Sequence, residues 1–175
     1  MSGGNRHGGT MLEPKPVTRE AIPRALEKAE RYRLLNEPVD AESICLDVLT
    51  IDPQNARALV MLVLALTDQF GEGSADALPR AREVLPRLRD DYERAYYAGI
   101  ISERRAKAHL KRGGHGAPAI AYEAFQEAMT WFEKAEAIRP AGNDDAVLRW
   151  NTCARILARH DLRPAPTDWS EPPLE

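Results

Sequence analysis

The chain has few residues of the kinds that build metal, redox or disulfide centres. It contains two cysteines and four histidines in 175 residues. Cys45 and Cys153 lie in opposite halves inside apolar stretches, which indicates small buried residues in a reducing compartment rather than a disulfide framework. His109 and His115 can meet at one turn, but two imidazoles without further ligands make a weak metal site. We therefore expect no metal and no cofactor.

Long apolar runs and a strong net charge are also lacking. The longest apolar candidate, residues 58–66, is about half of the roughly 18 residues that a membrane span needs. The first ten residues are polar and glycine-rich, and no apolar segment follows them that would form the core of a signal peptide. The formal net charge of -3 gives no general attraction to nucleic acid or to an anionic membrane. We expect a cytoplasmic protein without membrane insertion.

Catalytic motifs are absent as well. No nucleophile, base and orienting acid are clustered in a recognisable pattern. The glycine-rich run at residues 113–116 is not followed by the lysine and hydroxyl of a phosphate-binding loop, and no strand pattern precedes it. We interpret this run as a turn, and the sequence predicts a protein that is not an enzyme.

The chain does contain helical periodicity along almost its whole length. Apolar residues recur at helical spacing from Ile22 to His160, and no stretch alternates with a period of two. Prolines and glycines divide this region into seven predicted helices, at about 22–36, 40–51, 56–70, 76–85, 90–112, 118–138 and 144–160. The third is apolar nearly all round and is the predicted centre of the core. The fifth and sixth are long and are expected to pair antiparallel, so the predicted class is all-α.

Two of these helices share one spacing of small, apolar and proline residues: Ala41, Cys45, Val48 and Pro53 in one, and Ala128, Phe132, Ala135 and Pro140 in the other. In this spacing both runs resemble the second helix of a tetratricopeptide repeat, a helix hairpin of about 34 residues. In the same register Gly99 falls at a position where the family favours glycine. Two helix backbones approach closely there and leave no room for a side chain.

The resemblance implies three repeats, at about 22–55, 56–91 and 92–142, and a capping helix at 143–161. The implied fold is a right-handed α-solenoid of three antiparallel helix hairpins plus this cap, within a domain of residues 18–161. The third hairpin carries an insertion that lengthens each of its helices by roughly eight residues, or about 12 Å. Residues 1–17 and 162–175 are predicted to be flexible tails, and Trp169 either packs on the body or anchors a short recognition segment.

The resemblance further implies a non-enzymatic protein–protein interaction module, either a scaffold or an adaptor. The family's groove-lining positions fall on a set with an apolar centre flanked by charges: Leu26, Arg33, Arg57, Val60, Leu64, Tyr96, Ile100 and Glu103. An exposed patch of this kind would bind an extended segment or a helix of another protein. Alternatively, the last helix or a tail of the same chain fills it. The family's basic clamp for chaperone tails is not matched, since its positions are Leu26, Glu30, Glu93 and Tyr97.

A second candidate is a basic patch near the end of the fifth helix: Arg104, Arg105, Lys107, Lys111 and Arg112. The simplest interpretation is a solvated helix C-terminus, where basic residues interact favourably with the helix dipole. Two other functions stay open. One is a structural or self-associating subunit that uses the long hairpin. The other is a regulator that binds nucleic acid or an anionic ligand through this patch, which the negative net charge does not favour.

Overall fold

The computed structural model describes residues 12–71 and 74–165. The predictions for residues 1–11 and for Trp169 lie outside this part. Within it the chain forms seven α-helices and two short 3-10 turns, without a strand. The helices are α1 (Ile22–Leu34), α2 (Pro38–Ile51), α3 (Ala56–Asp68), α4 (Ala77–Val84), α5 (Asp91–Arg112), α6 (Ala117–Ala137) and α7 (Asp145–Arg159), and the 3-10 turns are Arg19–Ala21 and Leu85–Arg87. The predicted all-α class is confirmed for the described residues.

Prolines and capping side chains set the beginnings of several helices. Pro23, Pro38 and Pro118 each stand in the first turn of a helix, where the missing amide would have no internal partner. Asn55 and Asp90 cap α3 and α5 by accepting hydrogen bonds from backbone amides of the first turn. The sequence placed Pro38 in the turn before the second helix. It instead opens α2, which therefore begins two residues earlier than predicted.

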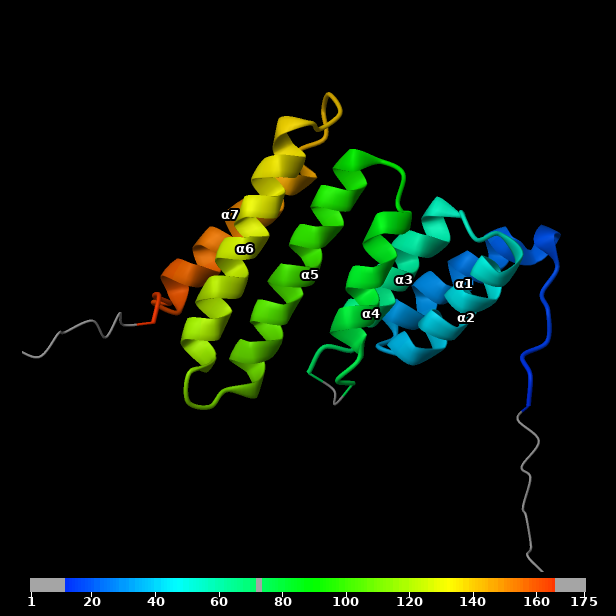
Figure 1. Cartoon of the computed structure of the whole chain (residues 1–175), viewed down its shortest axis with the longest axis horizontal. Coiled ribbons are helices and arrows are strands. Elements are labelled where there is room, and N and C mark those ends of the chain that lie inside the picture. The colour runs from blue at the N-terminus through cyan, green and yellow to red at the C-terminus, as the bar shows by residue number, and fades with distance from the viewer. Residues whose placement is uncertain (1–11, 72–73, 166–175) are drawn as a thin grey trace, which may run out of the picture.

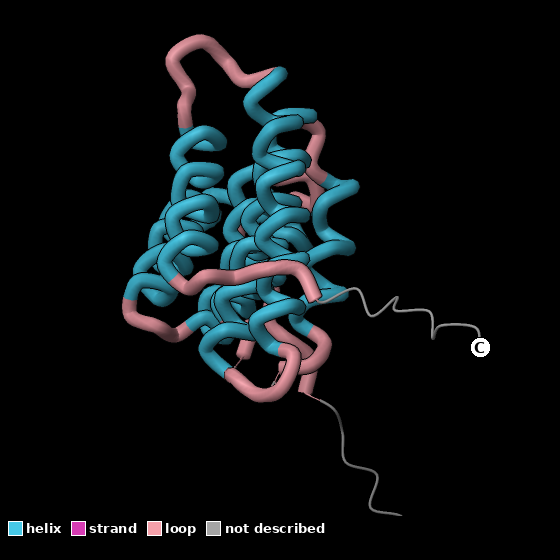
Figure 2. Tube along the Cα trace, turned by 90° about the vertical axis from the view of Figure 1, so that its left-hand side faces the viewer, coloured by secondary structure: helices cyan, strands magenta, loops and turns pink. Residues whose placement is uncertain are grey.

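The helices form two layers (Figure 1), here called the odd layer (α1, α3, α5 and α7) and the even layer (α2, α4 and α6). An ion pair joins each helix to the next helix of its own layer. In the odd layer these pairs are Arg33–Asp68, Arg104–Asp68 and Arg149–Glu103, and in the even layer Arg80–Glu42 and Arg82–Glu127. Seen from the side, the helix axes lie roughly along one line of direction, whichever way the chain runs (Figure 2). Lateral contacts between alternate helices thus accompany those between consecutive helices.

Two hydrophobic clusters lie between the layers. The first contains buried residues of α1, α2, α3 and α4. The second contains buried residues of α5, α6 and α7 around the rings of Phe125 and Phe132. Helix α3 is the centre of the first cluster, as predicted, since eight of its thirteen residues are buried. Helix α5 connects the clusters, because Ile101 packs in the first while the preceding Ile100 packs in the second.

Helices α5 and α6 are the two longest of the described chain, with 22 and 21 residues. They run antiparallel side by side (Figure 1), which confirms the prediction of two long paired helices. Leu162, which the sequence assigned to a tail, is 8% exposed and packs into the second cluster. The packed body therefore extends beyond the predicted boundary at residue 161, and the segment after α7 crosses the end of the helix stack (Figure 2).

Gly99 of α5 packs directly against Phe132 of α6. A Cβ atom added to Gly99 would lie 2.5 Å from the ring of Phe132, far inside van der Waals contact. The predicted lack of room is confirmed, although an aromatic side chain, and not a helix backbone, occupies the space.

We expect Gly99→Ala to lower the free energy of unfolding by about 1–3 kcal/mol, the usual cost of overpacking a core. Alanine's better helix propensity, about 1 kcal/mol, opposes this loss. Urea denaturation measures the difference. In a Phe132→Leu background the same change is expected to cost less, because the smaller side chain leaves space. A Gly99→Ala protein as stable as the parent would contradict this account.

Each hydrophobic cluster also contains one free cysteine, Cys45 in the first and Cys153 in the second. Both side chains are fully buried. Burial raises the pKa of each thiol to about 12, since a thiolate is poorly solvated among apolar groups.

We therefore expect neither thiol to react with a disulfide reagent in the folded protein at pH 8, where about one molecule in ten thousand carries the thiolate. Both thiols are expected to react after denaturation in urea. Absorbance of the released reagent anion counts the reacted thiols. Rapid modification of either cysteine in the native protein would show that its cluster opens readily.

Candidate functional site

Six charged side chains from all four helices of the odd layer form ion pairs with one another. They form the charge cluster: Arg33 from α1, Asp68 from α3, Glu103, Arg104 and Lys107 from α5, and Arg149 from α7. The three residues of α5 lie within about one helical turn of each other, so one side of that helix presents them together. The cluster thus depends on the lateral arrangement of alternate helices.

Two carboxylates hold the cations of the charge cluster in place. Arg33 Nε donates to Asp68 Oδ2 at 2.7 Å, and Arg104 donates to the other oxygen of the same carboxylate. Lys107 and Arg149 both donate to Glu103 Oε1, the latter at 3.4 Å. Glu103 is completely buried, and among the described residues its Oε2 atom has no hydrogen-bond partner.

The charge cluster contains more positive than negative charge. Four cations face two carboxylates, and the neighbouring Arg57–Glu30 pair adds no net charge. Burial, followed by the nearby charges of Arg33 and Arg149, lowers the pKa of Arg104 to about 10. The guanidinium still carries its proton at neutral pH, so an excess of two positive charges persists in a partly buried place.

The beginning of α5 has the opposite character. A pocket of about 380 Å³ lies between this end of α5 and the α6–α7 turn, with a wall of tyrosines and an acidic rim: Tyr92, Tyr96, Tyr97, Asp90, Glu93, Asp145, Pro140 and Asn143. Burial, and then the charge of Asp90, raise the pKa of Glu93. Along α5 the surface of the odd layer therefore changes from acidic and aromatic to cationic.

The structure separates the predicted groove residues into two groups. Val60, Leu64, Tyr96 and Arg33 are half-buried and Arg57 is exposed. In contrast, the expected accessibility of three other residues is wrong: Leu26, Ile100 and Glu103 are 2%, 1% and 0% exposed. Leu26 and Ile100 face the two hydrophobic clusters, and Glu103 lies beneath the cations that it pairs with. The apolar part of the predicted groove that solvent can reach is therefore smaller than expected.

The predicted basic patch is also divided. Successive residues of a helix point about 100° apart. Arg104 and Lys107 therefore lie on one side of α5, where they pair with Asp68 and Glu103 and join the charge cluster. Arg105 instead pairs with Glu127 of α6 at 2.9 Å. Lys111 and Arg112 are exposed at the end of α5. The five residues therefore do not form one continuous surface.

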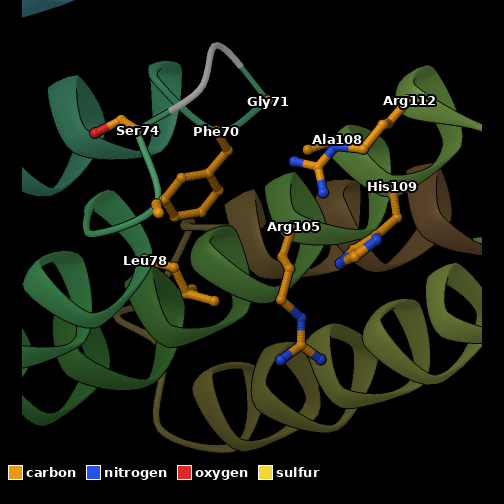
Figure 3. A pocket seen from close by; sticks show the side chains of 9 residues that line it. Phe70, Gly71, Ser74, Leu78, Arg105, Ala108, His109 and Arg112 are labelled. Atoms are coloured by element: carbon orange, nitrogen blue, oxygen red, sulfur yellow. The ribbon is translucent and has the colours of Figure 1, made fainter.

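Arg105 and Arg112 line a separate pocket of about 300 Å³ between α5 and the α3–α4 connection (Figure 3). Phe70 and Leu78 supply apolar walls on one side, and His109 lies on the α5 side between the two arginines in sequence. Burial, and then the charges of Arg112 and Arg105, lower the pKa of His109. The Nε atom of Arg105 is buried without a hydrogen-bond partner among the described residues.

Sequence reasoning did not single out Asp68, or the role of Arg149, in this site. The pairs they form join residues 36 and 46 positions apart, and no short motif marks such pairs. The only signal was the family register, which placed Arg33 and Glu103 on the groove side but gave no partner for either.

Within residues 12–71 and 74–165, no group of three or more histidine, cysteine or acidic side chains is arranged to hold a metal ion. No helix of this part is both long and apolar enough to cross a membrane.

Comparison of the chain with protein-family models, with curated proteins and with solved structures found no match. The resemblance to the tetratricopeptide family thus rests on the spacing of residues in the sequence, and any function has to be argued from the geometry of the odd layer.

Proposed function

We propose that the chain is a non-enzymatic protein–protein interaction module and that the surface of its odd layer binds a segment of a partner protein. The proposal rests on the occurrence of apolar anchors and fixed charges together on this layer. Half-buried apolar and aromatic side chains, Val60, Leu64 and Tyr96, lie on the same layer as the charge cluster. Apolar anchors bordered by fixed charges suit the recognition of a peptide or helix.

The architecture that supports this proposal is a short α-solenoid. In it, α1–α2, α3–α4 and α5–α6 are three stacked hairpins, and α7 covers the end as a cap. The same-layer ion pairs support this arrangement, because they join each hairpin to the next one in both layers. Stacked hairpins of this kind offer an extended surface, which suits a long partner segment better than a compact ligand.

The gradient of charge along α5 gives the bound segment a direction. A basic residue of the partner fits the acidic rim of Asp90 and Glu93, and an acidic residue fits the opposite, cationic end. An apolar residue between them would reach Tyr96 and Leu64. Complementary charges of this kind fix register and direction more than they add affinity.

The test is capture of a partner from native lysate with the 175-residue chain carrying Val60→Glu or Val39→Glu. Val60 is half-buried on α3, whereas Val39 is 63% exposed on α2, in the other layer. We expect Val60→Glu to reduce recovery of the partner at least about tenfold, because a charge would be buried at the contact. Val39→Glu is expected to leave recovery unchanged.

Thermal unfolding of both variants verifies that they are folded. A partner retained by Val60→Glu and lost with Val39→Glu would place the binding surface on the even layer and refute the proposal.

A further inference from the structure

Building on the proposed function, we infer that the charge cluster binds an anionic group of the partner segment that carries about two negative charges. A phosphorylated side chain and a pair of neighbouring carboxylates both have this chemistry. The inference concerns Arg104 and Lys107 above all, because they supply the positive charge that the cluster itself does not balance.

The first argument is the charge balance of the cluster. Arg33 with Asp68 and Arg149 with Glu103 would already form two neutral pairs between helices. Arg104 and Lys107 are added to the same two carboxylates. Cations kept together in a partly buried place repel each other and lose hydration, so they destabilise the protein while no further anion is bound. A dianionic group would remove this imbalance.

The second argument is the supply of hydrogen-bond donors. A guanidinium has five N–H donors and an ammonium three. Arg104 uses its Nη1 atom on Asp68, and Lys107 donates to a single oxygen of Glu103. The side chains of Arg104, Arg149 and Lys107 are 25%, 39% and 42% exposed. These partly exposed side chains therefore keep donors beyond those that Asp68 and Glu103 use, and we infer that an incoming oxyanion can reach them.

The third argument is preorganisation. Asp68 contacts two of the cations and Glu103 the other two, so side chains that are otherwise flexible are already oriented before a ligand arrives. The charges of Arg33 and Arg149 are close enough to Arg104 to add to the lowering of its pKa by burial. An anion placed between oriented cations gains their attraction at little cost in side-chain entropy.

The chain contains an acidic segment of its own, since residues 166–175 include Asp168, Glu171 and Glu175 and no lysine or arginine. The described chain before it leads along the second hydrophobic cluster, where Leu162 is buried, and across the end of the helix stack (Figure 2). The described residues 160–165 make no hydrogen bond or ion pair with the charge cluster, which favours a separate partner as its occupant.

The experiment titrates the full chain with inorganic phosphate and, separately, with succinate, against sodium chloride of equal ionic strength. Isothermal calorimetry and the thermal midpoint report binding. The double variant Arg104→Gln/Lys107→Gln leaves two balanced ion pairs. The control Arg24→Gln/Arg155→Gln removes the same charge from two exposed positions.

We expect saturable binding of at least one probe by the parent and by the control. The double variant is expected to bind at least about tenfold more weakly, the loss typical of a charge-assisted hydrogen bond. Phosphate binding without succinate binding would assign the site to a phosphorylated side chain, and the reverse to paired carboxylates. If the double variant does not fold, Lys107→Gln alone, at the most exposed of the cations, serves in its place.

Three outcomes would overturn the inference. The first is that neither probe binds saturably, and the second is that the double variant binds as the parent does. The third is that binding is seen only after Asp168, Glu171 and Glu175 are changed to their amides. The last result would show that the chain's own acidic segment fills the site. Partner capture that is lost with Val60→Glu but unaffected by Arg104→Gln/Lys107→Gln would refute the inference and leave the proposed function standing.

Discussion

Close packing of helices at small side chains is the constraint on which the rest of the structure depends. Ala41, Ala128 and Ala135 are completely buried, and Gly99 leaves room for the ring of Phe132. Because these positions carry little or no side chain, consecutive helices approach closely and alternate helices become neighbours. Only then can an aspartate at the end of α3 reach arginines from both α1 and α5. The hydrophobic clusters supply the stability, and this geometry places the charges.

The charge cluster combines two demands that oppose each other. As lateral links, its ion pairs join the four helices of the odd layer, which favours a rigid surface. As a group of four cations around two carboxylates, it carries a repulsion that a purely structural network would avoid, for instance with an apolar residue at position 104 or 107. Sites that bind charged ligands commonly retain such unbalanced charge at a cost in stability. The completely buried Glu103 shows how far the surrounding helices constrain this group.

The all-α class and the positions of the helices were predictable from local signals. Seven helices were expected and seven are described, with bounds that differ by about two residues, because prolines, glycines and capping residues act within one helical turn. The site was less predictable. Val60, Leu64 and Tyr96 are half-buried where exposure was expected, and Leu26 and Ile100 are buried, because a rotation of a helix by one residue moves a side chain from the surface to the core.

The sequence by itself thus determined the helices, their borders, the central place of α3 and the pairing of α5 with α6. Tertiary structure alone decided which of the basic residues act together. Arg104 and Arg105 are neighbours in the chain, yet one pairs with Asp68 in the odd layer and the other with Glu127 of α6. The physical reason is that helix periodicity is a local property, whereas the partner of a charge is set by how separate helices pack, which no short spacing in the sequence encodes.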